Sequence, residues 1–245
     1  MLRGCLPMFR VFGFFDVSSF SMFRVFVKKR IEMFRLKVLL LFLMPLLLLS
    51  GRPDGFSISE IDDATMARME GRSFGKDCTT RRSDLRYLTV LHYDLEGRVR
   101  KGELVCNKAI AQDLIEIFQA LYDARYPIEK MRLIDEYDGD DERSMADNNT
   151  SCFNFRKVSG TKSLSKHAYG RAIDINPLYN PYVRTVKGKQ KVEPANATTW
   201  AKNRTKAHHK TIITPDDLCV KLFKQHGFRW GGDWKRSKDY QHFDK

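Results

Sequence analysis

The sequence lacks the patterns that usually accompany a strong positive charge in nucleic-acid-binding proteins. Its 245 residues carry a formal net charge of +13, but no helix-turn-helix, RNA-recognition or zinc-finger pattern goes with it. This absence argues against nucleic acid as a partner. The surplus charge favours an anionic partner of another kind, such as acidic lipid or a bacterial wall polymer, and a solvated basic face is the plainer alternative.

Cysteine is scarce, and no two cysteines have C-x-x-C spacing, which excludes a thiolate zinc site or redox motif of that type. Cys5 lies in the leader region, and the remaining four are Cys78, Cys106, Cys152 and Cys219. An even number in an exported chain is compatible with disulfides, but the sequence does not choose among the three pairings. Four buried free thiols are the alternative.

The apolar run at residues 38–49 is shorter than the roughly 20 residues of a membrane-spanning helix. It follows a basic start, so residues 33–50 are predicted to be a signal peptide. A retained signal anchor is the alternative, since no A-x-A cleavage site follows. Residues 1–32 fit no targeting class, and we expect Met33 to be the true start. The protein is expected to be a monomer that is secreted or associated with the cell envelope.

Residues 51–75 are predicted to be a linker, and residues 76–245 are predicted to be one domain, since 42% of the chain is hydrophobic and no repeat divides it. Two β-rich runs joined by Leu95-Glu96-Gly97 predict a hairpin. Asn107 is expected to cap the amphipathic helix that follows, and Pro127 is expected to stop it.

The second half of the chain is predicted to contain strands at residues 128–137 and 151–158, separated by an acidic loop at residues 138–147. Residues 177–213 have little periodicity and predict a long loop of the kind that borders a site. A helix is expected to begin at Thr214, where a cap, a proline and carboxylates follow one another. This order of elements predicts an α+β fold.

His167 and Asp174 are ionisable groups in an otherwise buried, strand-like segment, so they need a partner that offsets their desolvation. A metal ion would serve. Gly170 lets the chain turn, so that His167 can fold back toward Asp174. A hydrolytic zinc site needs three ligands of the His/His/carboxylate kind, and His242 offers the third, with Asp239 three residues before it.

These residues form motifs that match a known family. The pattern S-x-H-x-x-G-x-A-x-D covers residues 165–174, W-G-G-D-W covers residues 230–234, and D-x-x-H-F covers residues 239–243. Together they resemble the zinc-dependent D-alanyl-D-alanine carboxypeptidases, which are relatives of the vancomycin-resistance dipeptidases and carboxypeptidases and of the phage L-alanyl-D-glutamate endolysins. The resemblance covers about residues 78–245.

The resemblance implies a hedgehog/D,D-peptidase-like domain, with a small antiparallel sheet carrying a Zn²⁺ site among packed helices. It implies that the zinc is held by His167, Asp174 and His242. Asp239 would be the general base, where many relatives have Glu; the shorter carboxylate is typical of the endolysin-like branch. The family also uses a basic or polar group near the scissile carbonyl, for which Arg156 is the candidate. Ser165 is expected to contact substrate or orient His167.

The function predicted from these residues is an exported zinc peptidase that cleaves peptidoglycan stem peptides, acting as a D-alanyl-D-alanine carboxypeptidase. Such an enzyme must bind a terminal carboxylate, a task for the guanidinium of Arg156 or Arg171. An L-alanyl-D-glutamate endopeptidase on the same scaffold is the alternative. A third reading is a non-catalytic, hedgehog-like binding module, which has no need to retain Asp239 alongside all three ligands. A fourth is a basic wall-anchoring protein with vestigial chemistry.

Overall fold

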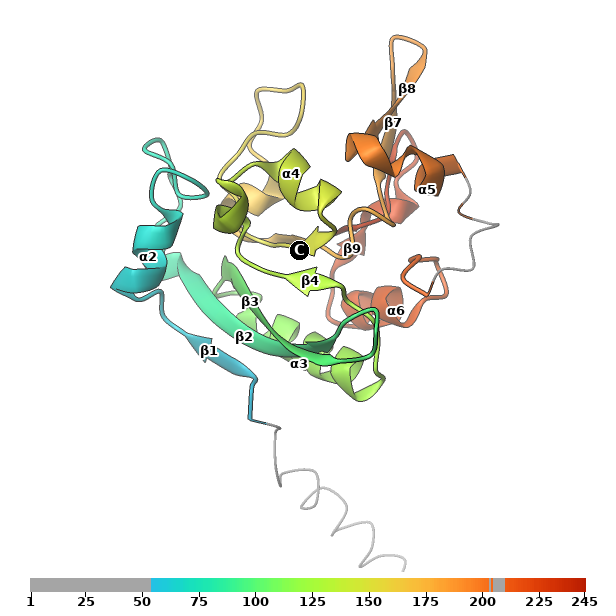
Figure 1. Ribbon diagram of the computed structural model, residues 1–245. Coiled ribbons are helices and arrows are strands. Elements are labelled where there is room, and N and C mark those ends of the chain that lie inside the picture. The colour runs from blue at the N-terminus through green and yellow to red at the C-terminus, as the bar shows by residue number, and fades with distance from the viewer. Residues whose placement is uncertain (1–53, 203, 205–209) are drawn as a thin grey trace, which may run out of the picture. The chain divides into compact units, whose positions relative to one another are not determined.

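The computed structural model describes residues 54–202, 204 and 210–245 (Figure 1). The predicted leader, residues 1–32, and the predicted signal, residues 33–50, lie outside the described residues. Within the part that is described, no helix has the length and apolar character needed to cross a membrane.

The described residues combine short helices with short, mostly antiparallel strands, so the α+β prediction is confirmed. The α-helices are α2 (Asp63–Met69), α3 (Ala111–Asp123), α4 (Asp141–Ala146), α5 (Thr198–Lys202) and α6 (Leu218–Gln225). The strands of the first half are β1 (Ser57–Ser59), β2 (Leu85–Tyr93), β3 (Val99–Asn107), β4 (Lys130–Met131) and β5 (Asn149–Thr150). The strands of the second half are β6 (Ala172–Asp174), β7 (Tyr182–Val186), β8 (Lys189–Glu193), β9 (Arg229–Trp230), β10 (Lys238–Asp239) and β11 (His242–Asp244).

The predicted hairpin forms the centre of an antiparallel sheet with the order β1-β2-β3. Leu88 lies opposite Leu104 across the hairpin, and both side chains are buried. Helix α3 packs against β2 (Figure 1). Leu114 and Phe118, on the apolar side of the helix, lie in the same core as Leu88 and Leu104. Alternating apolar residues in the strands and a 3.6-residue apolar period in the helix account for this packing.

The segment predicted as a linker, residues 51–75, belongs instead to the folded unit over the part that is described. Strand β1 pairs with the edge of β2, and Ser57 lies opposite Thr89. Helix α2 buries Met66 and Met69 in a second apolar cluster. Both elements are short, and tertiary contacts stabilise them.

Two helix starts differ from the predicted positions. Asn107 does not cap α3, because its side chain accepts a hydrogen bond from Ala109 N, at 3.0 Å, and the helix begins only at Ala111. The second helix, α6, begins after Asp217 rather than at Thr214, since the Asp217 carboxylate accepts from Cys219 N at 2.7 Å. In both cases a short turn precedes the first helical residue.

The acidic stretch at residues 138–147, predicted to be a loop, contains α4, whose start Asp140 caps by accepting from Arg143 N. Of the strand predicted at residues 128–137, only the two residues of β4 remain, and residues 151–158 form no regular strand. The predicted long loop at residues 177–213 contains the β7–β8 hairpin, which turns at Lys187 and Gly188, both with positive φ.

The four cysteines within the described residues are unpaired. Cys106, Cys152 and Cys219 are buried in the main core and pack there as small apolar side chains. The sequence left disulfides and free thiols as alternatives, and the structure has free thiols.

A second antiparallel sheet, with the order β6-β11-β9, carries the residues singled out by the motifs. Strand β10 lies just before β11 in the chain but pairs with β7 in another sheet. The chain therefore crosses between two sheets at Tyr240 and Gln241.

Candidate metal centre

His167 lies in a 3₁₀ turn, Lys166–Tyr169, that its neighbours hold in place. The Ser165 hydroxyl accepts a hydrogen bond from His167 N at 3.3 Å and caps the turn. Gly170 ends the turn at φ 64°, and a Cβ added there would lie 2.7 Å from Asn107 N. Glycine is therefore needed at this position both for its backbone angle and for the close approach to β3.

Asp174 and His242 come from neighbouring antiparallel strands, Asp174 from β6 and His242 from β11. They are direct partners in the register of the two strands, so their side chains lie on the same face of the sheet. Asp174 also bonds backbone to backbone with Ser151 on its other side, which fixes its position further.

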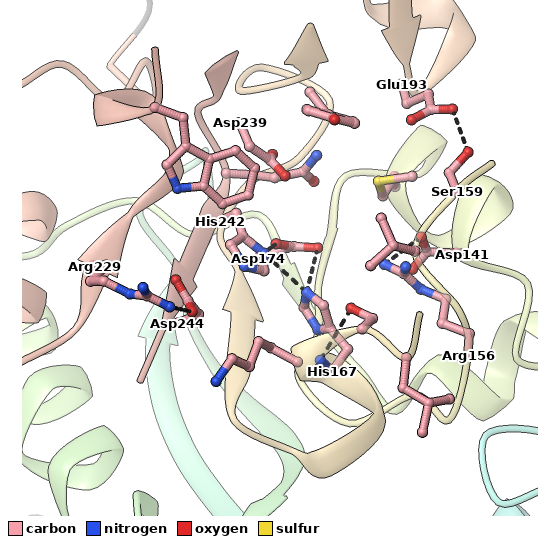
Figure 2. Close-up of a pocket in the computed structure, with 18 residues that line it drawn as sticks. Asp141, Arg156, Ser159, His167, Asp174, Glu193, Arg229, Asp239, His242 and Asp244 are labelled. Atoms are coloured by element: carbon pink, nitrogen blue, oxygen red, sulfur yellow. Dashed lines mark hydrogen bonds and ion pairs between the residues drawn. The ribbon is translucent and has the colours of Figure 1, made fainter. Parts of the chain in front are cut away.

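The three predicted ligands meet at one point (Figure 2). One ligand atom from each of His167, Asp174 and His242 lies within 4.8 Å of the others, and all three residues are buried. Asp174 Oδ1 is 3.0 Å from His242 Nδ1, and Asp174 Oδ2 is 3.2 Å from His167 Nε2. The two histidine nitrogens are 3.2 Å apart. The structure thus brings the predicted set together, and its role as a ligand set stays a prediction.

The hydrogen bond behind His167 fits the cluster to a metal ion. His167 Nδ1 is 2.6 Å from the Cys152 carbonyl oxygen, which only accepts, so Nδ1 carries the proton. In the neutral ring, Nε2 then presents a lone pair to the Asp174 carboxylate and to His242. A cation at this point would satisfy all three groups, and a backbone carbonyl that orients a ligating histidine is a common feature of metal sites.

The electrostatics also favour positive charge at this point. Burial by itself raises the pKa of the Asp174 carboxyl, but His167 and His242 hold that pKa well below its usual range. Burial has the largest single effect on His242 and lowers its pKa, but the hydrogen bond to Asp174 and the charges of the nearby carboxylates together outweigh burial and raise that pKa. The buried Asp174 carboxylate needs positive charge beside it, and either a proton on His242 or a metal ion would supply that charge.

Asp239, the predicted general base, lines the same pocket from β10 (Figure 2). Its Oδ1 is buried and has no hydrogen-bond partner within the described part of the chain. Burial raises the pKa of Asp239 to about 7, with a further increase from the charge of Asp174 and an opposing effect of His242. A carboxyl group in this state can both hold and release a proton near neutral pH.

Arg156 lines the pocket as predicted, but it is not a free cation. Its Nη2 is 2.7 Å from Asp141 Oδ2, and its buried Nε has no hydrogen-bond partner within the part of the chain that the structure describes. Sequence reasoning missed Asp141, because the acidic stretch that contains it was predicted to be a loop. Among the described residues that line the pocket, Arg171 is absent, and its side chain is exposed elsewhere.

A cavity of about 280 Å³ lies over the cluster. Besides the predicted residues, it is lined by Tyr182 and Glu193 of the β7–β8 hairpin and by Trp234, which is 37% exposed. Trp230, from the same W-G-G-D-W motif, is instead part of the core. Sequence reasoning missed Glu193, since no period marked the hairpin that carries it.

Comparison with known proteins agrees with the motifs. Residues 159–245 match a family model described as D-alanyl-D-alanine carboxypeptidase. This segment contains the whole cluster and Asp239, while Asp141 and Arg156 precede it. The match confirms the resemblance found from the motifs and supports a metallopeptidase. No solved structure matches this chain.

Proposed function

We propose that this chain, whose residues 159–245 match the D-alanyl-D-alanine carboxypeptidase family, is an exported zinc peptidase that releases the terminal D-alanine from peptidoglycan stem peptides. The observation that carries the proposal is the convergence of His167, Asp174 and His242 below a pocket that also holds the carboxylate of Asp239. Two histidines and one carboxylate are a donor set typical of hydrolytic zinc sites.

Zinc held by these residues would act as a Lewis acid, which lowers the pKa of water to about 7 and polarises the scissile carbonyl. Within the chain, Asp239 would accept a proton from the attacking water and pass it to the departing amine. The water oxygen bonds to the carbonyl carbon, the C–N bond breaks, and no redox partner is needed. The unpaired Oδ1 of Asp239 leaves an oxygen available for this task.

Arg156 is proposed to recognise the terminal carboxylate. Its guanidinium lies in the pocket, where Nη2 pairs with Asp141, Nη1 donates to the Lys157 carbonyl at 3.4 Å, and the buried Nε has no partner among the described residues. A guanidinium can bind a carboxylate through two parallel hydrogen bonds. Asp141 holds the side chain in the pocket while leaving this recognition to the remaining donors.

The localisation and partners are part of the proposal. A secreted or envelope-associated enzyme would meet the wall outside the cytoplasm, and a net charge of +13 would assist encounters with an anionic wall. We propose that the protein acts as a monomer, with membrane attachment only through a retained signal anchor and no role for nucleic acid.

Hydrolysis of defined stem pentapeptides by the full chain tests the proposal. We expect free D-alanine from a pentapeptide with a free C-terminus, much slower cleavage of its C-terminal amide, and loss of both reactions in the presence of a chelator. Mass spectrometry identifies the products. Fragments ending at L-alanine would instead identify the endopeptidase alternative, and a zinc-loaded protein without peptide products would favour the binding module.

A further inference from the structure

A loop and a hairpin meet at one edge of the pocket. Arg184 of β7 donates from Nη1 to the Ser159 carbonyl at 3.0 Å and from Nη2 to the Ser159 hydroxyl at 2.9 Å. The same hydroxyl donates to Glu193 Oε1 of β8 at 3.1 Å. We call this group of three residues, Ser159, Arg184 and Glu193, the Ser159 bridge.

The two charged members of the bridge are largely buried, while Ser159 is exposed. Arg184 and Glu193 form an ion pair at 3.2 Å, and their side chains are only 19% and 12% exposed. Ser159 and Glu193 both line the pocket. Hydrogen bonds with a charged partner are stronger than neutral ones, so the bridge fixes the loop against the hairpin.

Helix α4 is hydrogen-bonded to the segment that follows β8. The backbone N of Ala195, just after β8, donates to Glu142 of α4. Asn196 Nδ2 donates to the Ala146 carbonyl at the end of the same helix, at 3.1 Å. The loop, the hairpin and α4 are therefore linked to one another, and α4 also supplies Asp141, which holds Arg156.

Other residues bound the opposite side of the pocket. Figure 2 shows Glu193, Ser159 and Arg156 on one side of the metal-ligand cluster and Arg229 with Asp244 on the other. On that other side the Arg229 side chain is 70% exposed. The pocket thus has one end bounded by three linked segments and another end bounded by the ion pair of the exposed Arg229 with the buried Asp244.

We propose that the Ser159 bridge is a specificity determinant that makes the Arg156 end of the pocket blind, so that only a short, carboxylate-ended segment fits beyond the scissile bond. This inference rests on the proposed function and adds the reason for exopeptidase action. A single D-alanine would fill the space between the metal-ligand cluster and the bridge, with its carboxylate at Arg156. A longer chain would have to pass where Ser159 and Glu193 are joined.

The experiment compares two peptides that share the same D-alanyl-D-alanine bond. One is the stem pentapeptide, and the other carries two additional glycines after the terminal D-alanine, with a free C-terminus. The variants Ser159→Ala and Glu193→Ala remove the hydrogen bond between the Ser159 hydroxyl and Glu193 from its two sides. For each variant we expect the ratio of kcat/KM for the extended peptide to that for the pentapeptide to rise about tenfold or more. Ser159→Thr keeps the hydroxyl and should keep the wild-type ratio.

Gln190→Ala is the matched control, since Gln190 is an exposed residue of the same strand, β8. It should leave the ratio unchanged. The double variant Ser159→Ala/Glu193→Ala should change the ratio by less than the two single effects combined, because both changes remove the hydrogen bond between Ser159 and Glu193. Zinc content and the melting temperature are measured in parallel, so that loss of the fold is recognised separately from loss of the bridge.

The outcomes separate the two proposals. A wild-type protein that releases no D-alanine from the pentapeptide would overturn the proposed function. Wild-type activity on the pentapeptide, combined with a ratio that is the same in both bridge variants and in Gln190→Ala, would overturn the bridge while leaving the carboxypeptidase intact. Efficient cleavage of the extended peptide by the wild type would also overturn the bridge.

Discussion

At the scale of single residues, the candidate site depends on how each ligand is oriented. His167 is fixed from behind by the Cys152 carbonyl and from its turn by Ser165, so its Nε2 has one direction in which to point. Asp174 and His242 are fixed by the pairing of β6 with β11. None of these constraints depends on the side chain of another ligand, and changes to the ligand side chains should therefore affect metal binding more than the fold.

The first prediction concerns the metal ligands. His167→Ala and His242→Ala should reduce the zinc content of the purified protein from one ion per chain to nearly none, because each removes one of three ligands. Elemental analysis measures this directly. His226→Ala is the control, since His226 lies at the end of α6 beside Asp113 and does not line the pocket formed by the described residues. Unchanged zinc in both ligand variants would rule out the site.

The second prediction concerns Asp239. Asp239→Asn should lower kcat by about 10²–10⁴-fold, because an amide cannot accept the proton from water. Zinc should stay bound, since Asp239 lies outside the converging set. Peptide hydrolysis and elemental analysis on the same sample test both statements. A variant that has lost its metal would show that Asp239 is a ligand instead.

At the scale of elements, short segments are held by polar contacts at their turns. The clearest case is the turn between β2 and β3, where Asp94 is buried and accepts hydrogen bonds from the backbone N of Glu96 and of Arg98. Its second oxygen accepts from the side chains of Arg98 and Arg100, at 2.9 Å each. One carboxylate thus organises the turn of the longest hairpin in the described residues.

The third prediction is a pH dependence of stability at this turn. Burial alone would raise the pKa of Asp94, but the Arg98 backbone N–H and the two guanidinium groups hold it below its usual range. A carboxyl group whose pKa is lower in the folded state stabilises the fold above its unfolded pKa of about 3.9, and this stabilisation is lost as the pH falls through that value toward the folded pKa.

Asp94→Asn should therefore lower the free energy of unfolding at pH 7 and have a smaller effect below about pH 3. Urea unfolding at a series of pH values measures this. Asp123→Asn, at an exposed position at the end of α3, is the matched control and should show little change at either pH. An effect of Asp94→Asn that is the same at acid and neutral pH would contradict the assignment.

At the scale of the described domain, the metal-ligand cluster joins segments that are distant in the chain. Asp174 and His242 are paired across 68 residues, and His167 brings in the turn that packs on β3. A metal ion here would link the β6-β11-β9 sheet to the first sheet. Because Asp174 also pairs with both histidines directly, the fold does not depend on the ion alone.

The fourth prediction follows from this arrangement. Removal of zinc with a chelator should lower the melting temperature without abolishing cooperative unfolding, and re-addition of zinc should restore it. A ligand at 100 times its Kd stabilises the folded state by about 2.7 kcal/mol. Calorimetry with and without chelator measures the shift, and His242→Ala should show none. A melting temperature that is the same with and without zinc in the wild type would contradict metal binding to the folded state.

The sequence by itself determined the local features of this protein. The alternating runs of β2 and β3 predicted their hairpin, and the close spacing of His167, Gly170 and Asp174 predicted a turn that returns one ligand toward another. These features depend on backbone preferences and on periodicities of 2 and 3.6 residues, which a sequence displays directly.

Only the tertiary structure decided which distant groups complete the site. Strand β1, helix α4 and the β7–β8 hairpin are too short to display a period, and they form because neighbouring segments bury their side chains and bond their ends. Asp141 and Glu193 reach the pocket on two of these elements. Their positions depend on contacts between segments far apart in the chain. The chemistry near His167 could therefore be predicted from the sequence, but the shape of the pocket around it could not.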